Sequence, residues 1–586
     1  MRDTWNLDKL YLVYDDPKYL ADFTRFNQVI TEYNQFKPRF ASYENKKTTL
    51  LEFLKLNVEF SLLTDRLYNF SSLKSSTNST DSQAVKEMTT LQMKFTELAA
   101  TETAYKKWLR NFPEIDETLA SDPFLKEHTF IIHEIIENGK YMLDEQTELL
   151  IAQLRQSGSS AWGRLQKLLT STMAVSYEGK EITLSEVRNL AYHHDALVRK
   201  NAYEAELAAY KSVEKSLAFA LNGIKGEVNT LSEFRGYASP LDQALVSSRM
   251  KRSTLDAMLA VMTDYLPVFR SYLKRKAQLL GHKNGLPFYD LFAPIGNITT
   301  TYTIEEASDY IRKNFKTFNS RLYAMADKAF KENWIDFTPK KGKVGGAFCS
   351  NIISIKESRV LTNFTGAFGD IITIAHELGH AYHGEAIFQE SPLNSDYTMP
   401  VAETASTFCE TIVNKAALKD ATNLEEKIYL LESSIQDYTQ VIVDIMSRFI
   451  FEKSVFEGRK TTVFDENELN KLMIDAQKQT YGDGLDESLL HPYMWACKGH
   501  YYSGGLSYYN FPYAFGLLFA KGLYARYLAD KPAFVAIYDD LLAATGHMSV
   551  EEVAKLASID VTKPEFWKGS LEIIKEDIDL FLELTK

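Results

Sequence analysis

IAHELGHAYH, residues 374–383, is the stretch on which the interpretation of this chain depends. It contains the pattern His-Glu-x-x-His, no proline interrupts it, and the apolar residues around it suit the buried face of a helix. On a helix, His376 and His380 lie one turn apart, with Cβ atoms roughly 5–6 Å apart. Two imidazoles at this spacing can share one tetrahedral zinc ion, and Glu377 can then reach a metal-bound water. The alternative is a pair of hydrogen-bonded histidines in a core.

A third protein ligand is expected, because a catalytic zinc site usually combines three side chains with an open position for water. Pro400 stands where a second helix would begin, and that helix would run on through Val413. Glu403 and Glu410 are seven residues apart and would share one of its faces. Glu403 is therefore the candidate third ligand of one Zn²⁺ ion; the alternative is an ordinary solvated acidic face.

Two further residues near the pattern have open roles. Glu410 could orient one of the imidazoles from behind, or it could belong to a solvated acidic face. A metal pattern with a third histidine requires glycine at the position of His383 and histidine at the position of Ala386. The sequence has neither. We therefore expect His383 to be a hydrogen-bonded neighbour of the site and not a ligand.

Composition limits the classes of protein to consider. The chain has 586 residues, of which 45% are hydrophobic and 25% are charged, as in folded globular proteins. The net charge of −12 argues against a nucleic-acid-binding surface, which needs a basic patch. Three cysteines do not suggest a disulfide framework or a cysteine zinc site. No apolar run suits a signal peptide or a membrane span, so we expect a cytoplasmic protein without a membrane partner.

Helical periodicity dominates the rest of the chain. Residues 1 to about 110 predict long amphipathic helices, and helical patterns continue to about residue 335. A small hairpin is expected around Glu178-Gly179. The segments 347–355 and 358–364 are rich in β-forming residues and predict a second hairpin just before the metal helix. This hairpin could offer an open strand edge to an extended peptide, or it could be purely structural.

A segment rich in glycine, histidine and tyrosine extends from His491 to Tyr513. Its glycines permit an irregular path, and its side chains supply hydrogen-bond donors. Phenol and imidazole groups can stabilise an oxyanion beside a metal ion, whereas the alternative is a stack of aromatic rings packed on the protein. We take His500, Tyr509 and Tyr513 as candidate catalytic residues.

Together these features resemble the oligoendopeptidase F group of zinc oligopeptidases, in the same clan as thimet oligopeptidase. The resemblance extends over nearly the whole chain and is carried by WNLDKLY (residues 5–11), SGSSAW (residues 157–162), the His-Glu-x-x-His pattern, Glu403 with Glu410, and the loop with Gly499-His500, Tyr509 and Tyr513. It implies a mainly α-helical, two-lobed body around a deep channel, with one zinc ion at its floor and a small β-hairpin beside the zinc helix. We place an N-terminal helical lobe at residues 1–190 and the catalytic region at residues 191–586.

The resemblance also implies an activity: hydrolysis of internal bonds in short unfolded oligopeptides, because folded proteins do not fit such a channel. Oligopeptides are then the expected partners, and the oligomeric state is left open between monomer and homodimer. Its zinc ligands fall on His376, His380 and Glu403, and its general base, which activates the zinc-bound water, falls on Glu377.

Further roles follow from the same resemblance. The transition-state histidine and tyrosine fall on His500 and Tyr509. A second tyrosine falls on Tyr513, although related groups place it one residue earlier, where this chain has Pro512. The substrate-binding strand falls on the end of the second hairpin, with Val360, Leu361 and Asn363.

Two other interpretations stay open. A zinc carboxypeptidase or dipeptidase on a similar helical channel would need a cationic side chain that binds a free carboxylate. A non-catalytic, peptide-binding helical module would hold no metal and would be insensitive to chelators.

Overall fold

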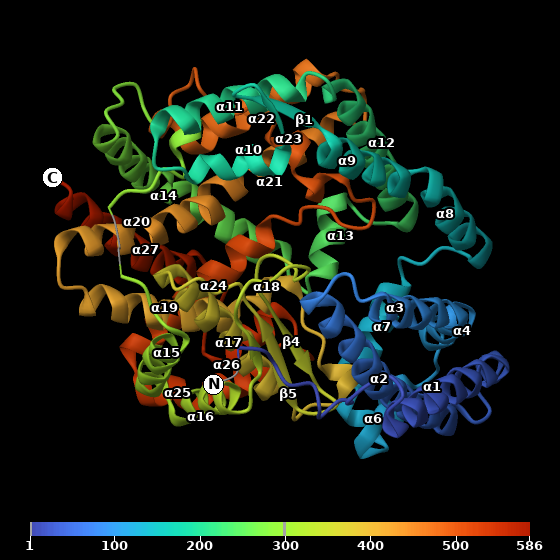
Figure 1. Ribbon diagram of the computed structural model, residues 1–586. Helices are drawn as coiled ribbons and strands as arrows, with labels where there is room; N and C mark the ends of the chain where they lie inside the picture. The colour runs from blue at the N-terminus through green and yellow to red at the C-terminus, as the bar shows by residue number, and fades with distance from the viewer. Residues whose placement is uncertain (1–2, 297–299) are drawn as a thin grey trace.

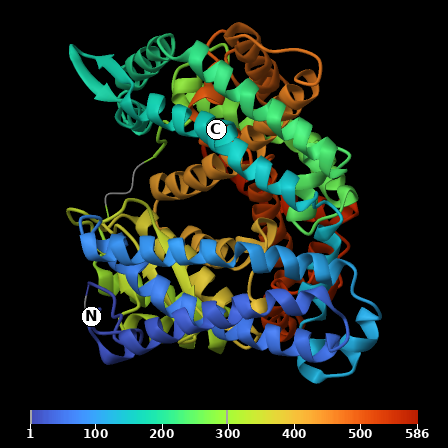
Figure 2. The ribbon, with the colours of Figure 1, turned by 90° about the vertical axis from the view of Figure 1, so that its right-hand side faces the viewer.

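The structure is a computed structural model in which residues 3–296 and 300–586 are described (Figure 1). The fold is mainly α-helical with two small β-sheets, which confirms the predicted fold class. Figure 2 shows an upper and a lower group of helices, which the late part of the chain, coloured red, joins along one side. In the described residues, no helix combines the length and the apolar character that crossing a bilayer requires.

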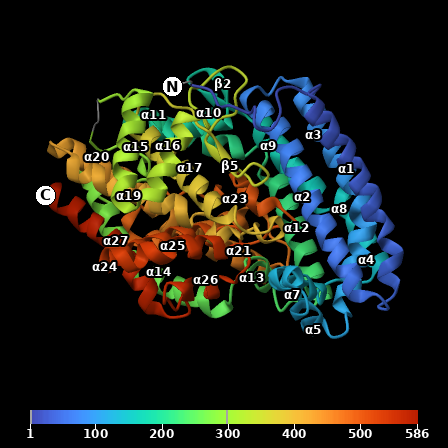
Figure 3. The same cartoon turned by 90° about the horizontal axis from the view of Figure 1, so that it is seen from below.

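The N-terminal helices form a layer along one side of the molecule (Figure 3). They are amphipathic: α2, for example, buries Leu63, Leu67 and Phe70, which recur at helical spacing. The elements are α1 (Pro17–Gln35), α2 (Lys46–Thr77), α3 (Ser82–Phe95), α4 (Ala99–Arg110), α5 (Ile115–Ala120), α6 (Pro123–Glu127) and α7 (Thr129–Gly139).

The next part of the chain contains the first predicted hairpin. Its turn residues Glu178 and Gly179 both have positive φ angles, 48° and 76°, as a two-residue hairpin turn requires. The elements are α8 (Glu145–Ser157), α9 (Ser159–Thr172), β1 (Ala174–Tyr177), β2 (Lys180–Thr183), α10 (Leu184–Asn189), α11 (Ala196–Tyr210), α12 (Glu214–Arg235), α13 (Pro240–Ser247) and α14 (Arg252–Leu279).

The second sheet contains the second predicted hairpin and one strand that the sequence did not indicate. Its strand order is β3–β5–β4, with β5 parallel to β3 and antiparallel to β4. The additional strand is β3, only two residues long. The elements are α15 (Ile304–Phe318), α16 (Ser320–Lys331), β3 (Ile335–Asp336), β4 (Phe348–Ile352) and β5 (Glu357–Leu361).

The remaining elements run from the His-Glu-x-x-His helix, α17, to the C-terminal helix, and α19 and α25 among them pack against α17. A π-helical turn, Gln440–Asp444, joins α20 to α21 without a break in the helical path. The elements are α17 (Phe368–Ile387), α18 (Met399–Ala402), α19 (Thr404–Asp420), α20 (Leu424–Thr439), α21 (Ile445–Gly458), α22 (Glu466–Tyr481), α23 (Met494–Cys497), α24 (Phe511–Ala529), α25 (Lys531–Ala544), α26 (Val550–Leu556) and α27 (Pro564–Leu584).

Across residues 3–296 and 300–586, the buried apolar side chains form two clusters. One runs from Leu10 to Ile132 and includes Ile352 of β4. The other runs from Met173 to Phe581 and contains the core around α17. The chain therefore passes from one cluster to the other between residues 132 and 173, before the predicted boundary at residue 190.

Candidate metal centre

The side chain of Asp370, in the first turn of α17, caps the start of that helix. Further along, α17 packs closely against α19. Asp370 accepts hydrogen bonds from the backbone N–H groups of Thr365, Gly366 and Ala367, at 2.7–3.1 Å, and so satisfies donors at the start of the helix. A Cβ on Gly379 would lie 2.5 Å from the Cα of Ser406 in α19. The absence of a side chain at Gly379 thus lets the two helix backbones approach closely.

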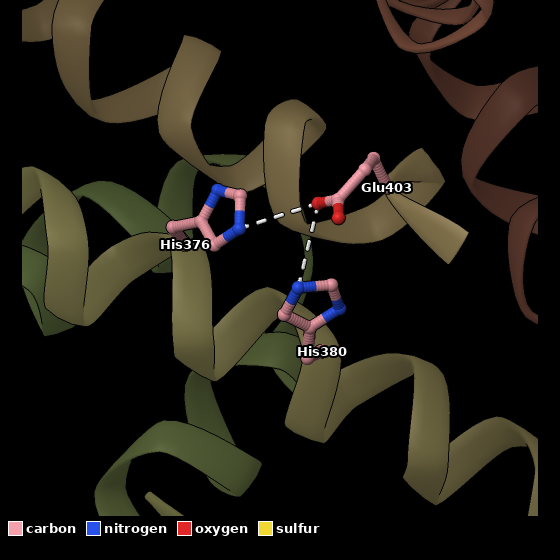
Figure 4. Close-up of side chains that lie close together, drawn as sticks. All are labelled: His376, His380 and Glu403. Carbon is pink, nitrogen blue, oxygen red and sulfur yellow. Dashed lines mark ion pairs between the residues drawn. The ribbon is translucent and has the colours of Figure 1, made fainter. Parts of the chain in front are cut away.

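The close approach brings three potential ligands together (Figure 4). Glu403 Oε2 lies 3.2 Å from His376 Nε2 and 3.4 Å from His380 Nε2. One ligand atom from each residue lies within 4.8 Å of the other two, and this is the group in the described residues with the make-up of a metal site. Two imidazoles and one carboxylate are a donor set that suits zinc.

Glu403 lies at a helix break and not inside the single helix that the sequence predicted. Helix α18 ends at Ala402 and α19 begins at Thr404, while Glu403 itself has φ −88° and ψ 6°, outside the helical range. Ser406 donates a hydrogen bond of 2.7 Å to Glu403 Oε2 and orients the carboxylate. The prediction of an unbroken helix is therefore wrong, because the chain bends at the residue that faces the histidines.

The charges of the centre depend on one another. Burial opposes ionisation of Glu403, but hydrogen bonds from both histidines outweigh it and hold its pKa well below the usual range. Burial likewise opposes the charged form of His376, but Glu403 and Glu410 outweigh it and raise its pKa to about 10. Such a concentration of carboxylate charge around imidazoles is an environment that a divalent cation can satisfy.

Glu410 engages the other nitrogen of His376. Its Oε2 lies 3.3 Å from Nδ1 of that ring, at the side away from Glu403. Of the two roles left open by the sequence, the contact favours the orienting one over a solvated acidic face.

Glu377 and His383 stand on the same helix in different surroundings. Glu377 is 6% exposed, and burial raises its pKa against the opposing pull of His376 and His380. His383 is fully buried, stacks on Tyr397 with ring centroids 4.3 Å apart, and its Nε2 lies 2.8 Å from Thr545 Oγ1. It is outside the ligand group, as expected.

The loop before α24 and the first turn of that helix bring the three candidate residues together. The ring centroids of His500 and Tyr509 lie 4.9 Å apart, and those of Tyr509 and Tyr513 lie 5.5 Å apart. Tyr513 lines the same recess as His376 and Glu403. Tyr509 does not line that recess, and its hydroxyl lies 3.8 Å from the sulfur of Met399.

Burial lowers the pKa of His500, with help from Arg448 and Lys498, so its ring is neutral. Its Nδ1 is buried and without a hydrogen-bond partner among the described residues. Burial raises the pKa of Tyr513, so its hydroxyl keeps its proton and stays a donor. Both are groups that can still take up a hydrogen-bonding partner.

Two of the three residues predicted to bind substrate lie on a strand that is paired on both sides. Val360 and Leu361 lie on β5, whose backbone pairs with β3 on one side and β4 on the other. A peptide cannot add to a strand that is paired on both edges. The two end strands of the sheet are β3 and β4. The N-terminal segment flanks the β3 end, where Phe337 N donates to the carbonyl of Asp3 and Asn6 N to that of Asn333. In the described residues the open edge is therefore that of β4, which packs beside α17. Asn363 supports this edge indirectly, because its Nδ2 donates to the carbonyl groups of Val344 and Gly346 in the loop that leads into β4.

A recess of about 550 Å³ opens beside the centre, and sequence analysis missed most of its residues. Besides His376 and Glu403, it is lined by α20 with Ser433 and Asp437 and by Lys521 of α24. The sequence held one signal, because Lys521 is a cation within an apolar stretch of its helix. The α20 residues gave none, since Ser and Asp on an amphipathic helix are ordinary surface residues.

Comparisons with known proteins cover the whole chain. A sequence model of peptidase family M3 matches residues 189–573, and one described as oligopeptidase F matches residues 111–174. Oligopeptidase PepF of Bacillus subtilis is 23% identical across 99% of this chain and 87% of that protein.

Two crystal structures share the fold. A protein from Chlamydophila abortus is 20% identical, with a TM-score of 0.83 over 99% of this chain and 98% of that one. Oligoendopeptidase F from Enterococcus faecium is 18% identical, with a TM-score of 0.71 over 96% of this chain and 99% of that one.

Proposed function

The chain belongs to peptidase family M3 and to its oligoendopeptidase F group, and from this we propose that it is a zinc-dependent endopeptidase that cleaves internal bonds of short, unfolded peptides. The observation that carries the proposal is the convergence of His376, His380 and Glu403 from two packed helices, beside a recess and an open strand edge. A metal site, a cavity and an edge for an extended chain are the parts that a metallopeptidase needs.

The two histidines and Glu403 are the residues that would hold one zinc ion. The donor set fits the ion, and Glu410 behind His376 and Ser406 behind Glu403 hold two of these ligands in place. When bound, zinc supplies a Lewis acid that activates water and polarises a carbonyl group.

Glu377 is the proposed proton carrier. It follows a ligand directly in the sequence, it is buried, and burial raises its pKa towards the range in which a carboxylate acts as a base. In the proposed reaction its carboxylate accepts a proton from the attacking water and passes it to the nitrogen of the leaving amine.

His500, Tyr509 and Tyr513 are the proposed donors to the oxyanion that forms on the peptide carbonyl. A neutral imidazole and a protonated phenol each have one hydrogen to donate. Of the two tyrosines, Tyr513 has the stronger support, because it shares the recess with His376 and Glu403.

An extended peptide would pair with β4 along its open edge. The strand is held on α17, because Asn351 Nδ2 donates to the carbonyl of His380 at 3.1 Å. A Cβ on Gly384 would lie 2.3 Å from the Oδ1 atom of that asparagine, so the contact is tight. Backbone hydrogen bonds along this edge would hold a substrate beside the metal ligands whatever its side chains are.

The test is digestion of peptides of graded length, with free or blocked termini, before and after treatment with a chelator. We expect chelator-sensitive cleavage at internal bonds of peptides blocked at both ends, and no cleavage of a folded protein. Cleavage that requires a free C-terminus would instead identify a carboxypeptidase. If none of the peptides is cleaved in a chelator-sensitive way, the proposal is refuted.

A further inference from the structure

The recess beside the metal centre has a chemical character of its own. We propose that it is a subsite for a lysine or arginine side chain of the peptide, with Asp437 as the counter-ion; this rests on the proposed function and adds a substrate preference to it. The wall around the recess is formed by α17, α19, α20 and α24, so it adjoins the ligands and lies within reach of a residue next to the scissile bond.

Asp437 is an acid without a partner, and burial, together with the nearby charge of Glu410, raises its pKa to about 7. A cation bound beside it would favour its charged form. In the described residues, no hydrogen bond or ion pair involves its side chain, and it is accessible from the recess that it lines. The other carboxylates of the recess are engaged, Glu403 by the two histidines and Glu410 by His376. A free carboxylate in an otherwise paired cavity is available to a ligand cation.

Lys521, the cation of the same recess, does not neutralise Asp437. Its Nζ donates to Thr411 Oγ1 at 3.0 Å and to the hydroxyl of Tyr438 at 2.8 Å. The side chain is only 2% exposed. It forms no ion pair with Asp437 and is too deeply buried to meet a substrate carboxylate directly.

The walls suit the aliphatic part of a long basic side chain. Apolar groups supply most of the lining surface, and the apolar side chains among them are Phe368, Ile372, Leu430, Val441 and Leu517. Lysine and arginine bury a hydrocarbon stem while the charged end seeks a polar partner. A volume of about 550 Å³ holds such a side chain with space for water.

The backbone after Asp437 is also irregular. The π-helical turn Gln440–Asp444 follows within one turn, and Gln440 and Val441 of that turn line the recess. An extra residue in a helical turn widens it and alters the direction of its side chains, and such turns occur frequently at functional sites. The wall that carries Asp437 is therefore shaped by more than ordinary helix packing.

The test compares two peptides that differ at one position next to the scissile bond, lysine in one and norleucine in the other. Both are acetylated and amidated, so that lysine is the sole cation, and the pair is made for each position on either side of the bond. For wild type we expect, at one position, a kcat/KM about ten- to a hundredfold higher for lysine. Asp437→Asn should remove most of this preference by lowering kcat/KM for the lysine peptide towards that of the norleucine peptide.

The matched control is Glu425→Gln, which removes a negative charge from the exposed start of the same helix, outside the recess. It should keep the lysine preference. Equal preference in wild type and Asp437→Asn, or no preference at any position, would overturn the proposal while leaving the peptidase assignment intact. If wild type cleaves neither peptide, the proposed function itself fails. The norleucine peptide is also made with a free N-terminus. If Asp437→Asn slows the cleavage of that peptide alone, the carboxylate binds the α-amine and the proposal is overturned.

Discussion

His376 is the residue on which the charges of the centre converge. Its two ring nitrogens face Glu403 and Glu410, at 3.2 Å and 3.3 Å. A ring held at both nitrogens has a defined orientation, which a free ring lacks. Because Glu410 contacts the nitrogen that does not face Glu403, its contribution to zinc affinity can be measured without removing a proposed ligand.

We expect Glu410→Ala to weaken zinc binding by about ten- to a hundredfold, because it removes the group that orients a ligand. Glu410→Gln, which keeps an acceptor oxygen, should lose less. Competition with a chromogenic chelator measures both. Unchanged zinc affinity in the alanine variant would mean that Glu410 does not orient His376 and belongs to a solvated acidic face.

Glu377→Gln tests the proton carrier. The substitution keeps the size of the side chain and removes its basicity, so we expect zinc to stay bound while peptide hydrolysis falls by about a hundred- to ten-thousandfold. Metal content by mass spectrometry and turnover of a quenched fluorescent peptide are measured on the same preparation. Near-normal turnover would show that another group moves the proton.

At the scale of elements, the contact of α17 with α19 sets the distance between the ligands. We expect Gly379→Ala to destabilise the protein by about 1–3 kcal/mol and to weaken zinc binding, because the added Cβ meets backbone atoms that cannot move aside. Gly369→Ala on the same helix is the control, since its Cβ would meet no atom within 4 Å. Denaturant unfolding distinguishes them, and equal stability of the two variants would contradict this account.

The open edge of β4 can be tested by hydrogen exchange. In the inactive Glu377→Gln variant, a saturating peptide should slow amide exchange in residues 348–352, whose outer edge is free. The amides of β5 should change little, because they already lie in a strand paired on both sides. Protection confined to β5, with none in β4, would exclude addition of the peptide at this edge.

At the scale of the whole molecule, the proposed metal ligands come from helices that belong to the larger hydrophobic cluster. A bound ion therefore links parts of one core, and its binding free energy adds to stability. We expect a chelator to lower the melting temperature, and added zinc to restore it, with a gain of about 2.7 kcal/mol when zinc is at a hundred times its Kd. Glu403→Ala should show no such response; a normal response would remove Glu403 from the ligand set.

The N-terminal layer reaches the site through the sheet. Asp65 of α2 accepts a hydrogen bond of 3.0 Å from Ser354 N, and Ser350 of β4 donates one of 2.9 Å to Asn69. Ile352 of β4 belongs to the N-terminal hydrophobic cluster. The proposed peptide edge therefore packs against both hydrophobic clusters. The lobe boundary predicted at residue 190 does not reveal this contact between the two parts of the chain.

Local features of the sequence were enough to predict the helical class, both hairpins and the pairing of His376 with His380. Periodicity, turn residues and i,i+4 spacing are properties of neighbouring residues, so they can be recognised without knowledge of the fold. Glu403 was also identified from the sequence, although the break in the helix at that residue was not.

Tertiary structure alone decided which strand of the sheet is open, because β3 covers β5 from a segment more than twenty residues away in the chain. It also decided that Asp437 lies in the recess beside the metal ligands, since four helices from separate parts of the sequence form that wall. Contacts of this kind depend on how distant segments pack, so they cannot be predicted from the spacing of neighbouring residues.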